Sequence, residues 1–215
     1  LKNALDLGKC TVLRELNLQS AATGSTGWWL SIGSCRQLRK LNVRNQAQAK
    51  TGGSTSTALD LTSQTKLEEL DARGTQVQSV TFATGAPLVK AYLPGTLATL
   101  RLEYLPKLTA ANLTLETWSN VRTLIFDTCP GLDWETILNR CANIDRLRVT
   151  GIDREDDGTW LNKFVNMGGV DAEGNSTDTC ALVGTVRLTK YLDEDTYAAY
   201  TAHFPELNIL QPEYT

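Results

Sequence analysis

The chain has 215 residues, 41% of them hydrophobic, and a formal net charge of −3 at pH 7. This composition is that of a folded, soluble protein, and the length allows one sizeable core or two small ones. The charge gives no global attraction to nucleic acid, and no apolar run approaches the roughly 18 residues that span a bilayer. We therefore expect neither a nucleic-acid partner nor membrane insertion.

The first ten residues, LKNALDLGKC, lack the basic, apolar and small-residue order of a signal peptide. The chain also begins without methionine, inside what reads as a repeat. We therefore expect a piece of a longer protein, so the missing targeting signals carry little weight.

One phrase, aliphatic-x-x-aliphatic-x-aliphatic, recurs along the whole chain. Its last two aliphatic residues enclose a polar residue, which is the period of a half-buried strand. Because one short strand cannot bury its apolar side alone, successive turns must stack. The phrase occurs at 13–18, 38–43, 67–72, 97–102, 121–126 and 144–149, and less cleanly at 183–188 and 207–210. We predict one parallel sheet through Leu16, Leu41, Leu70, Leu124, Leu147, Val186 and Leu207.

Other segments between the phrases predict the second layer. The stretches 26–35 and 132–141 each begin with a capping residue or glycine and predict short helices. Two further strand-like stretches, VQSVTF (77–82) and LVKAYL (88–93), cannot be assigned to a face from the sequence.

Three of the five cysteines precede the first aliphatic residue of a phrase by three places. These are Cys10, Cys35 and Cys141. A small thiol in this register would end a helix and point into the stack. A metal site or disulfide is the alternative, but no C-x-x-C pair occurs and His203 is the only histidine. We expect buried thiols in a protein that folds in a reducing compartment; Cys129 and Cys180 fall outside the register and are either buried or reactive.

The step of 39 residues between Leu147 and Val186 is the longest in the chain, so part of it must leave the stack. We predict a protruding element at 153–179, with a helix near 160–167 and an exposed loop at 171–178. Its acidic start, DREDDG (153–158), matches the first half of a calcium loop but has Phe164 at the twelfth position. A solvated loop that caps the following helix is the alternative to calcium.

No catalytic arrangement is indicated by the sequence. A lone histidine gives no Ser-His-Asp or Cys-His constellation, and the glycines at 167–175 do not lie between a strand and a helix as a dinucleotide loop requires. We therefore expect a protein that is not an enzyme and needs no cofactor or metal.

The phrase L-x-x-L-x-L resembles the signature of the leucine-rich-repeat family over nearly the whole chain, although the asparagine or cysteine expected after each strand is irregular. The resemblance implies an α/β fold. It would be a single solenoid over 1–215, with a parallel sheet on the concave side and mixed short helices and strands on the convex side.

In such a solenoid the polar residues between and after the strand aliphatics form parallel rows on the concave face. Amides and guanidinium groups there can pair with sugar hydroxyls, carboxylates or phosphates, whereas the alternative is a generic solvated face. The candidate partner-binding residues are Asn17, Asn42, Arg44, Asp71, Arg73, Arg101, Arg148 and Arg187.

The last third, from the Gly-Val-Asp and Gly-Asn turns of 158–188 through YLDEDTYAAYTAHFPELNIL (191–210), resembles leucine-rich segments of phage and prophage virion proteins. This resemblance implies a structural and adhesion module of a virion, at the tail or the particle surface. Its partners would be other virion subunits or a host surface protein or glycan. The alternatives are a bacterial cell-surface domain that binds a host protein or glycan, and an intracellular protein-interaction scaffold.

Overall fold

The computed structural model describes residues 5–19, 29–46, 49–53 and 56–212. These residues form two compact units. Unit 1 comprises residues up to 122 together with 128–143, and unit 2 comprises 123–127 together with residues from 144 onward. The fold is α/β with mostly parallel sheets, and the described residues contain two α-helices.

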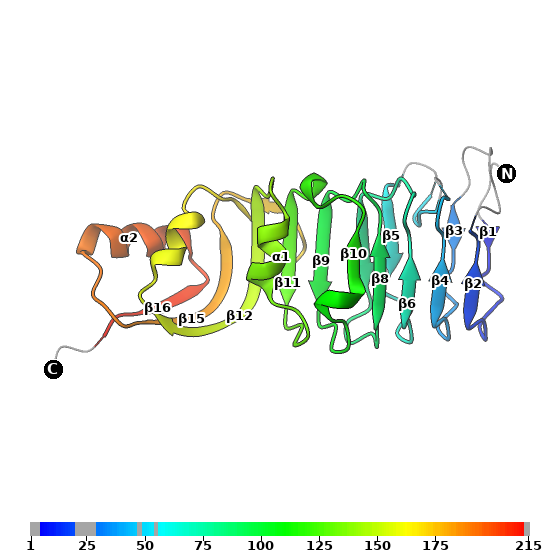
Figure 1. The fold of residues 1–215 in the computed structure, drawn as a ribbon, viewed down its shortest axis with the longest axis horizontal. Coiled ribbons are helices and arrows are strands. Elements are labelled where there is room, and N and C mark those ends of the chain that lie inside the picture. Colours follow the sequence, from blue (N-terminus) through cyan, green and yellow to red (C-terminus); the bar gives the residue numbers. More distant parts are fainter. Residues whose placement is uncertain (1–4, 20–28, 47–48, 54–55, 213–215) are drawn as a thin grey trace. The chain divides into compact units, whose positions relative to one another are not determined.

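Unit 1 contains a parallel sheet formed by every second strand from β2 to β10 (Figure 1). Its strands are β2 (Glu15–Asn17), β4 (Lys40–Asn42), β6 (Glu69–Asp71), β8 (Lys90–Leu93) and β10 (Leu113–Leu115). They pair side by side in this order. We call this sheet the front sheet.

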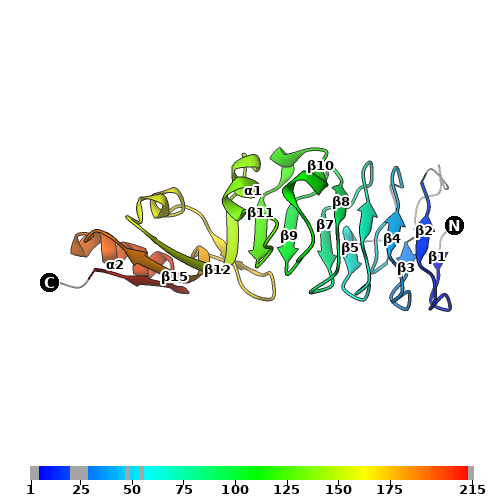
Figure 2. The ribbon, with the colours of Figure 1, turned by 60° about the horizontal axis from the view of Figure 1, so that its bottom comes forward.

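The intervening strands of unit 1 lie behind the front sheet and also pair in parallel (Figure 2). They are β1 (Leu5–Asp6), β3 (Leu30–Ser31), β5 (Ala58–Leu61), β7 (Ser79–Phe82) and β9 (Thr99–Glu103). Each circuit of the chain therefore adds one strand to each side. Of the two stretches without an assigned face, 77–82 contributes β7 at the rear and 88–93 contributes β8 at the front.

The core of unit 1 lies between the two sets of strands and consists of stacked aliphatic rows. Leu16, Leu41, Leu70 and Ala91 occupy one register of the front sheet. Alternation within a three-residue strand turns its middle residue inward and its neighbours outward, so the short motifs Glu-Leu-Asn, Lys-Leu-Asn and Glu-Leu-Asp suffice to form the sheet.

The corners between strands explain two of the cysteines, one of them from the recurrent set. Each corner residue lies three places after a buried residue at or next to the end of a strand, and its side chain reaches a backbone carbonyl of the preceding circuit. Cys35 Sγ donates to Leu7 O at 3.5 Å, and Gln64 Nε2 donates to Ile32 O at 2.9 Å. In a later circuit Cys129 Sγ contacts Leu102 O at 3.5 Å. These contacts tie successive circuits together.

The predicted cysteine register was partly wrong. Cys35 and Cys141 are buried as predicted, and Cys141 follows α1 (Trp134–Arg140) as its C-cap, as expected of a cysteine that ends a helix. Cys10 is only partly buried, and Cys129, which lay outside the predicted register, occupies a corner like that of Cys35. Cys35 does not end a helix, because Leu30–Ser31 is strand β3 and a turn follows it; residues 26–28 of the predicted helix lie outside the described residues. All five cysteines are thiols.

The helix predicted at 132–141 is confirmed. The carboxylate of Asp133 accepts the Thr136 N–H at 2.9 Å, which satisfies one of the unpaired donors at the start of α1. Two short 3₁₀ helices, Ala110–Asn112 and Trp118–Asn120, complete the elements of unit 1.

Unit 2 contains a four-strand parallel arrangement in the order β11, β12, β15, β16. The strands are β11 (Thr123–Asp127), β12 (Arg146–Asp156), β15 (Ala181–Leu188) and β16 (Leu207–Leu210). The register between β12 and β15 shifts at Thr150/Ile152, where Gly184 has φ +144° and its Cα faces a carbonyl. A side chain at position 184 would collide with that carbonyl, so the irregularity requires glycine.

The segment between β12 and β15 holds a 3₁₀ helix at Thr159–Lys163 and an antiparallel pair, β13 (Gly169–Val170) and β14 (Ser176–Thr177). The helix predicted near 160–167 is thus present as a shorter 3₁₀ helix. Residues 153–156, at the start of the predicted protrusion, belong to β12. In the loop 171–178 the side chain of Asp171 accepts the Asn175 N–H at 2.8 Å, as expected for a turn. The assignment of one domain with an insertion at 153–179 stays a prediction.

Helix α2 (Glu194–His203) begins at Asp193, whose carboxylate accepts the Thr196 N–H at 2.9 Å. The helix packs on the 3₁₀ segment through Tyr200, whose hydroxyl donates to Asn162 Oδ1 at 2.6 Å. Phe204, which follows the helix, is fully buried. Residues 204–207, of sequence FPEL, follow α2 and close the core of unit 2 through Phe204.

The prediction of one sheet through seven phrases was wrong in its register. Leu16, Leu41 and Leu70 share the front sheet of unit 1, whereas Leu124 pairs with Leu147 in unit 2. In the predicted sheet Val186 would lie opposite Leu147, but it pairs with Arg154 instead. Leu207 pairs with Gly184 and not with Val186. The phrase at 97–102 gives β9, a rear strand. The phrase misleads because rear and front strands bury the same alternate aliphatic residues.

Candidate binding surface

The outward face of the front sheet carries two rows of polar side chains. On each strand the residue before the buried position contributes to the first row, and the residue after it to the second. The first row is Glu15, Lys40, Glu69 and Lys90, and the second is Asn17, Asn42, Asp71 and Tyr92. Neighbours in a row are directly paired across strands, so both rows are continuous.

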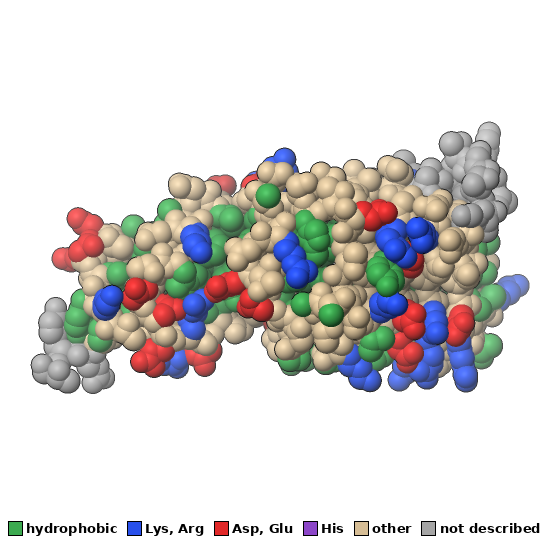
Figure 3. Space-filling model, viewed as in Figure 1, with side chains coloured by type: hydrophobic (Ala, Val, Ile, Leu, Met, Phe, Trp, Pro, Cys, Tyr) green, Lys and Arg blue, Asp and Glu red, His purple; other side chains and the backbone are tan. Residues whose placement is uncertain are grey.

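The first row alternates in charge from strand to strand. Lys40 Nζ lies 3.9 Å from a carboxylate oxygen of Glu15 and 3.5 Å from one of Glu69. Figure 3 shows the resulting mixture of basic and acidic side chains over the lower ends of β2, β4 and β6. Because these side chains are 42–69% exposed, the pairs contribute little to stability, about 0–1 kcal/mol each. They leave their charged groups accessible to a partner.

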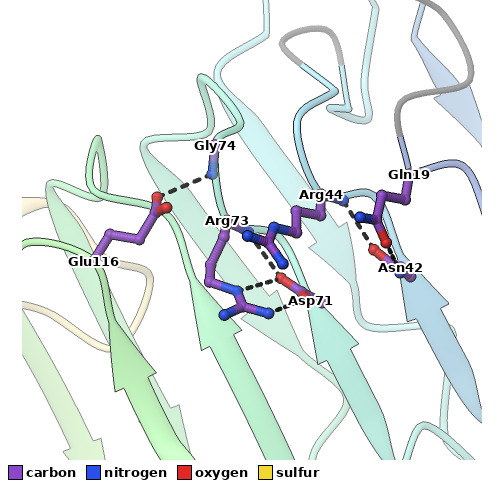
Figure 4. Close-up of polar contacts among 7 residues, drawn as sticks. All are labelled: Gln19, Asn42, Arg44, Asp71, Arg73, Gly74 and Glu116. Atoms are coloured by element: carbon purple, nitrogen blue, oxygen red, sulfur yellow. Dashed lines mark hydrogen bonds and ion pairs between the residues drawn. The ribbon is translucent and has the colours of Figure 1, made fainter.

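The second row closes the turns that follow the strands. Asn17, Asn42 and Asp71 each accept the backbone N–H of the residue two places on, at 3.0, 3.1 and 3.2 Å. The Asn42 amide also donates to Gln19 Oε1 at 3.2 Å (Figure 4). These turn-closing contacts are a structural reason for Asn or Asp at this position. They also hold the row in fixed orientations.

Arg73 is clamped between Asp71 and Tyr92. Its Nε and Nη2 donate to the two carboxylate oxygens of Asp71 at 2.9 and 2.5 Å (Figure 4). Its guanidinium carbon lies 4.2 Å from the ring centroid of Tyr92. Partial burial opposes ionisation of Asp71, but the hydrogen bonds from Arg73 outweigh it and lower the pKa of this carboxyl. The same hydrogen bond raises the pKa of Arg73. Both groups are therefore ionised at neutral pH.

Arg44 lies beside this clamp, one circuit earlier (Figure 4). Its charge also helps to lower the pKa of Asp71. Glu116, which follows β10, accepts the N–H groups of Gly74 and Gly95 at 2.9 and 3.0 Å, so one carboxylate joins the turns after β6 and β8. The turns that border the second row are thus fixed to one another.

The two rows enclose a shallow groove of about 270 Å³. Its lining contains three carboxylates, two lysine ammonium groups, two amides and the Tyr92 side chain. Lys90 Nζ lies 5.0 Å from the centroid of the Tyr92 ring. A hydrogen bond with the Tyr92 side chain raises the pKa of this lysine. The groove offers donors and acceptors of both charges in a regular array.

The structure brings together five of the eight predicted site residues. Asn17, Asn42, Arg44, Asp71 and Arg73 lie along the front sheet of unit 1.

The other three lie elsewhere, each beside an acidic side chain. Arg101 is on the rear strand β9, 3.3 Å from Glu103. In unit 2, Arg148 lies 3.1 Å from Glu206 and Arg187 lies 2.5 Å from Asp153. They do not extend the groove.

Sequence analysis missed the first row and Tyr92. The signal was present, because the alternation that turns Asn17 outward also turns Glu15 outward. Tyr92 was missed because the face of the stretch 88–93 was left open.

A larger hollow, about 610 Å³, lies at the rear strands β3 and β5. Its lining is mostly backbone and small side chains, and Asp60 is its single charged residue. The Asp60 carboxylate already accepts the N–H and hydroxyl of Thr62 at 2.9 and 2.7 Å.

In the acidic stretch 153–158, carboxylate groups accept hydrogen bonds from neighbouring groups of the protein. Asp156 accepts the Gly158 N–H at 2.8 Å and the Trp160 indole N–H at 3.0 Å, and Asp157 caps the following segment through Thr159. Over residues 5–19, 29–46, 49–53 and 56–212, no cluster of three or more His, Cys, Asp or Glu side chains is arranged to hold a metal ion. A ring nitrogen of His203 lies 2.9 Å from the Phe164 carbonyl oxygen, a contact within unit 2.

Comparisons with protein-family models, with curated proteins and with solved structures found no match. Within the described ranges, no helix has the length and apolar character needed to cross a membrane.

Proposed function

We propose that this chain is a leucine-rich-repeat solenoid that serves as a non-enzymatic structural and adhesion module of a phage virion. The recurrent L-x-x-L-x-L phrase and the parallel stacking of circuits in unit 1 support the repeat assignment. The resemblance of residues 158–210 to virion proteins supports the setting. The partners proposed are other virion subunits or a protein or glycan of the host surface.

The observation that carries the binding role is the groove between the two outward rows. Its side chains come from four neighbouring strands, and the turns beside it are held by hydrogen bonds, so a partner meets a preorganised surface. Carboxylates and ammonium groups occur there in nearly equal number, which suits a polar partner with donors and acceptors of its own. A uniformly anionic polymer fits it poorly, because the acidic side chains would repel phosphates.

The setting can be tested by immunogold electron microscopy. Antibodies against the purified chain are applied to particles released by prophage induction from the organism that encodes it. Labelling at the tail or the particle surface is expected. Recovery of the chain only in cell-envelope or cytosolic fractions, with unlabelled particles, would reject the virion assignment in favour of a surface domain or an intracellular scaffold.

The groove can be tested with a Lys40→Gln/Lys90→Gln variant. Labelled chain is titrated onto host cells and onto particles that lack the chain, and the variant should bind at least several-fold more weakly. Lys66→Gln is the matched control, because Lys66 is exposed on a turn outside the groove lining. Equal loss in the control, or unchanged binding in the variant, would remove the groove from the proposed contact.

A further inference from the structure

The charges of the first row are complementary to the same row read in the opposite direction. From β2 to β8 the row reads Glu15, Lys40, Glu69, Lys90. Read from β8 to β2, each position carries the opposite charge. Two first rows laid against each other in opposite order therefore bring unlike charges together at all four positions.

A twofold axis between two front sheets produces this arrangement. When the axis is parallel to the strands and passes between β4 and β6, the order of the strands is reversed and their direction is kept. The first row then faces the first row. Glu15 meets Lys90 of the second copy, and Lys40 meets Glu69 of the second copy. These contacts involve only β2, β4, β6 and β8, so they hold whatever adjoins the outer side of β2.

The second row fits the same axis. Asn42 faces Asp71 of the second copy, and Asn17 faces Tyr92 of the second copy. The Asn42 amide donates one N–H to Gln19 Oε1. A primary amide has two N–H donors, so the other remains for the facing carboxylate. Neither row places like charges together.

Other face-to-face twofold arrangements do place like charges together. An axis along the direction in which the strands stack sets the first row against the second, so that Glu69 meets Asp71 of the second copy. An axis that passes through β4, rather than between two strands, sets Lys40 against Lys40 and Glu15 against Glu69. The charges thus select one arrangement and reject the others.

The charged groups of the first row are accessible on this face. The side chains of Glu15, Lys40 and Glu69 are 69%, 47% and 42% exposed, and Figure 3 shows charged groups uncovered over β2, β4 and β6. Two copies space their strands equally, at about 4.8 Å, so their charges match without adjustment. A different partner would have to reproduce both the spacing and the alternation.

We propose that the front sheet binds the front sheet of a second copy of this chain, about a twofold axis parallel to the strands and between β4 and β6. This inference rests on the binding role proposed for the front sheet and names a second copy as one partner of it. The shared face is only four strands wide, which places the dimer in the weak class that buries less than about 1,200 Å² in total. Dilution therefore leaves the groove free for another partner.

Sedimentation equilibrium of the whole chain, over about a hundred-fold range of concentration, measures the association. We expect a concentration-dependent dimer. Its Kd should rise at least several-fold between about 0.1 M and about 1 M salt, because the Debye length falls from about 10 Å to about 3 Å. A chain that is monomeric throughout, or a dimer that salt does not weaken, would overturn the proposal.

Charge reversal tests the pairing. Lys90→Glu sets two carboxylates together at position 15 of the second copy, and Glu15→Lys sets two ammonium groups together at position 90. Each variant alone should dimerise at least several-fold more weakly than the native chain. An equimolar mixture of the two should recover most of the native association, because every contact in the mixed dimer then joins unlike charges.

The mixture also excludes a folding defect, since mixing cannot repair a misfolded chain. Lys66→Glu is the matched control, because Lys66 is exposed on a turn outside the groove lining, and it should dimerise as the native chain does. Equal weakening by Lys66→Glu, or no recovery in the mixture, would overturn the proposed pairing.

Zero-length cross-linking with a carbodiimide identifies the contact. Within one chain Glu15 and Lys90 lie on strands separated by β4 and β6, about 14 Å apart at the usual strand spacing, so a direct amide between them joins two copies. An equal mixture of unlabelled and nitrogen-15-labelled chain should give a mixed-label peptide that links Glu15 to Lys90. Mixed-label links confined to residues outside the front sheet would overturn the proposal.

These measurements use the chain alone, whereas the groove in the proposed function is tested on particles and host cells. A monomeric chain whose Lys40→Gln/Lys90→Gln variant still loses attachment would overturn only the second copy as a partner. A salt-sensitive dimer with the expected cross-link, together with unchanged attachment of that variant, would support this inference and remove the groove from attachment.

Discussion

Truncation of the same leucine in two consecutive circuits should have very different costs. Leu41 is 1% exposed and is paired on both sides, with Leu16 in β2 and Leu70 in β6. Leu41→Ala removes about three carbon groups, worth roughly 2.4 kcal/mol of transfer free energy at about 0.8 kcal/mol each, and leaves a cavity closed by both neighbours. We expect a loss of about 3 kcal/mol in the free energy of unfolding.

Leu16→Ala should cost only about 1 kcal/mol. Leu16 is already partly exposed, and among the described residues it has a strand neighbour on one side only, so its removal opens no closed cavity. With an m-value of about 2 kcal/mol per molar urea, the midpoint should fall by about 1.5 M for Leu41→Ala and about 0.5 M for Leu16→Ala.

Urea titrations followed by tryptophan fluorescence measure these midpoints. Because the described chain forms two units, hydrogen exchange with peptide-level mass spectrometry should accompany them and assign the transition to unit 1. An equal or larger loss for Leu16→Ala would refute the reasoning, since it would mean that the first circuit is as closed as the second.

Four other substitutions or conditions test the description. Leu147→Ala, at a fully buried position of β12, should cost about 2–5 kcal/mol by thermal or urea unfolding, and a loss below about 0.5 kcal/mol would contradict its place in the core. Gly184→Ala should cost more than about 2 kcal/mol, because its Cβ would lie 2.0 Å from a β12 carbonyl oxygen; normal stability would refute the register shift. Burial raises the pKa of Cys180 to about 12, so at pH 8 it should resist alkylation until the chain unfolds, and rapid labelling of the native protein would contradict its burial. Hydrogen bonds from the Thr196 N–H and hydroxyl lower the pKa of Asp193 below 3.8. The stability that the ionised Asp193 adds to α2 is therefore complete above pH 3.8 and is lost as the pH falls through the lowered pKa. Unchanged hydrogen-exchange protection of α2 at about pH 2.5 would contradict this capping role.

Local alternation in the sequence predicted many of the strands, but it missed β1, β3, β5 and β10 and could not assign the predicted ones to sides. Leu41 and Leu100 stand in the same phrase, yet the first lies at the front and the second at the rear. An inward aliphatic residue satisfies the same requirement on either side of one core, and only the pairing of distant strands distinguishes the two. The alternation of Glu15, Lys40, Glu69 and Lys90 likewise becomes visible only when the strands are in register.

Corner and turn residues show a similar limit. Cys35 and Gln64 differ in chemistry and occupy equivalent corners, because both can donate to a carbonyl of the preceding circuit. A search for repeated cysteines therefore missed Gln64. The helix caps at Asp133 and Asp193 depend only on residues three places away, and such a local signal is why the helix at 132–141 could be predicted from the sequence.

Photo-cross-linking from the groove tests the proposed binding role most directly. p-Benzoylphenylalanine is placed at position 90, within the groove, and in a matched chain at position 66, outside it, and each chain is assembled into particles. Irradiation should join position 90, and not position 66, to one identified virion subunit or host surface component. Adducts of equal yield from both positions, or none from position 90 in particles that contain the chain, would contradict a binding function of the front sheet.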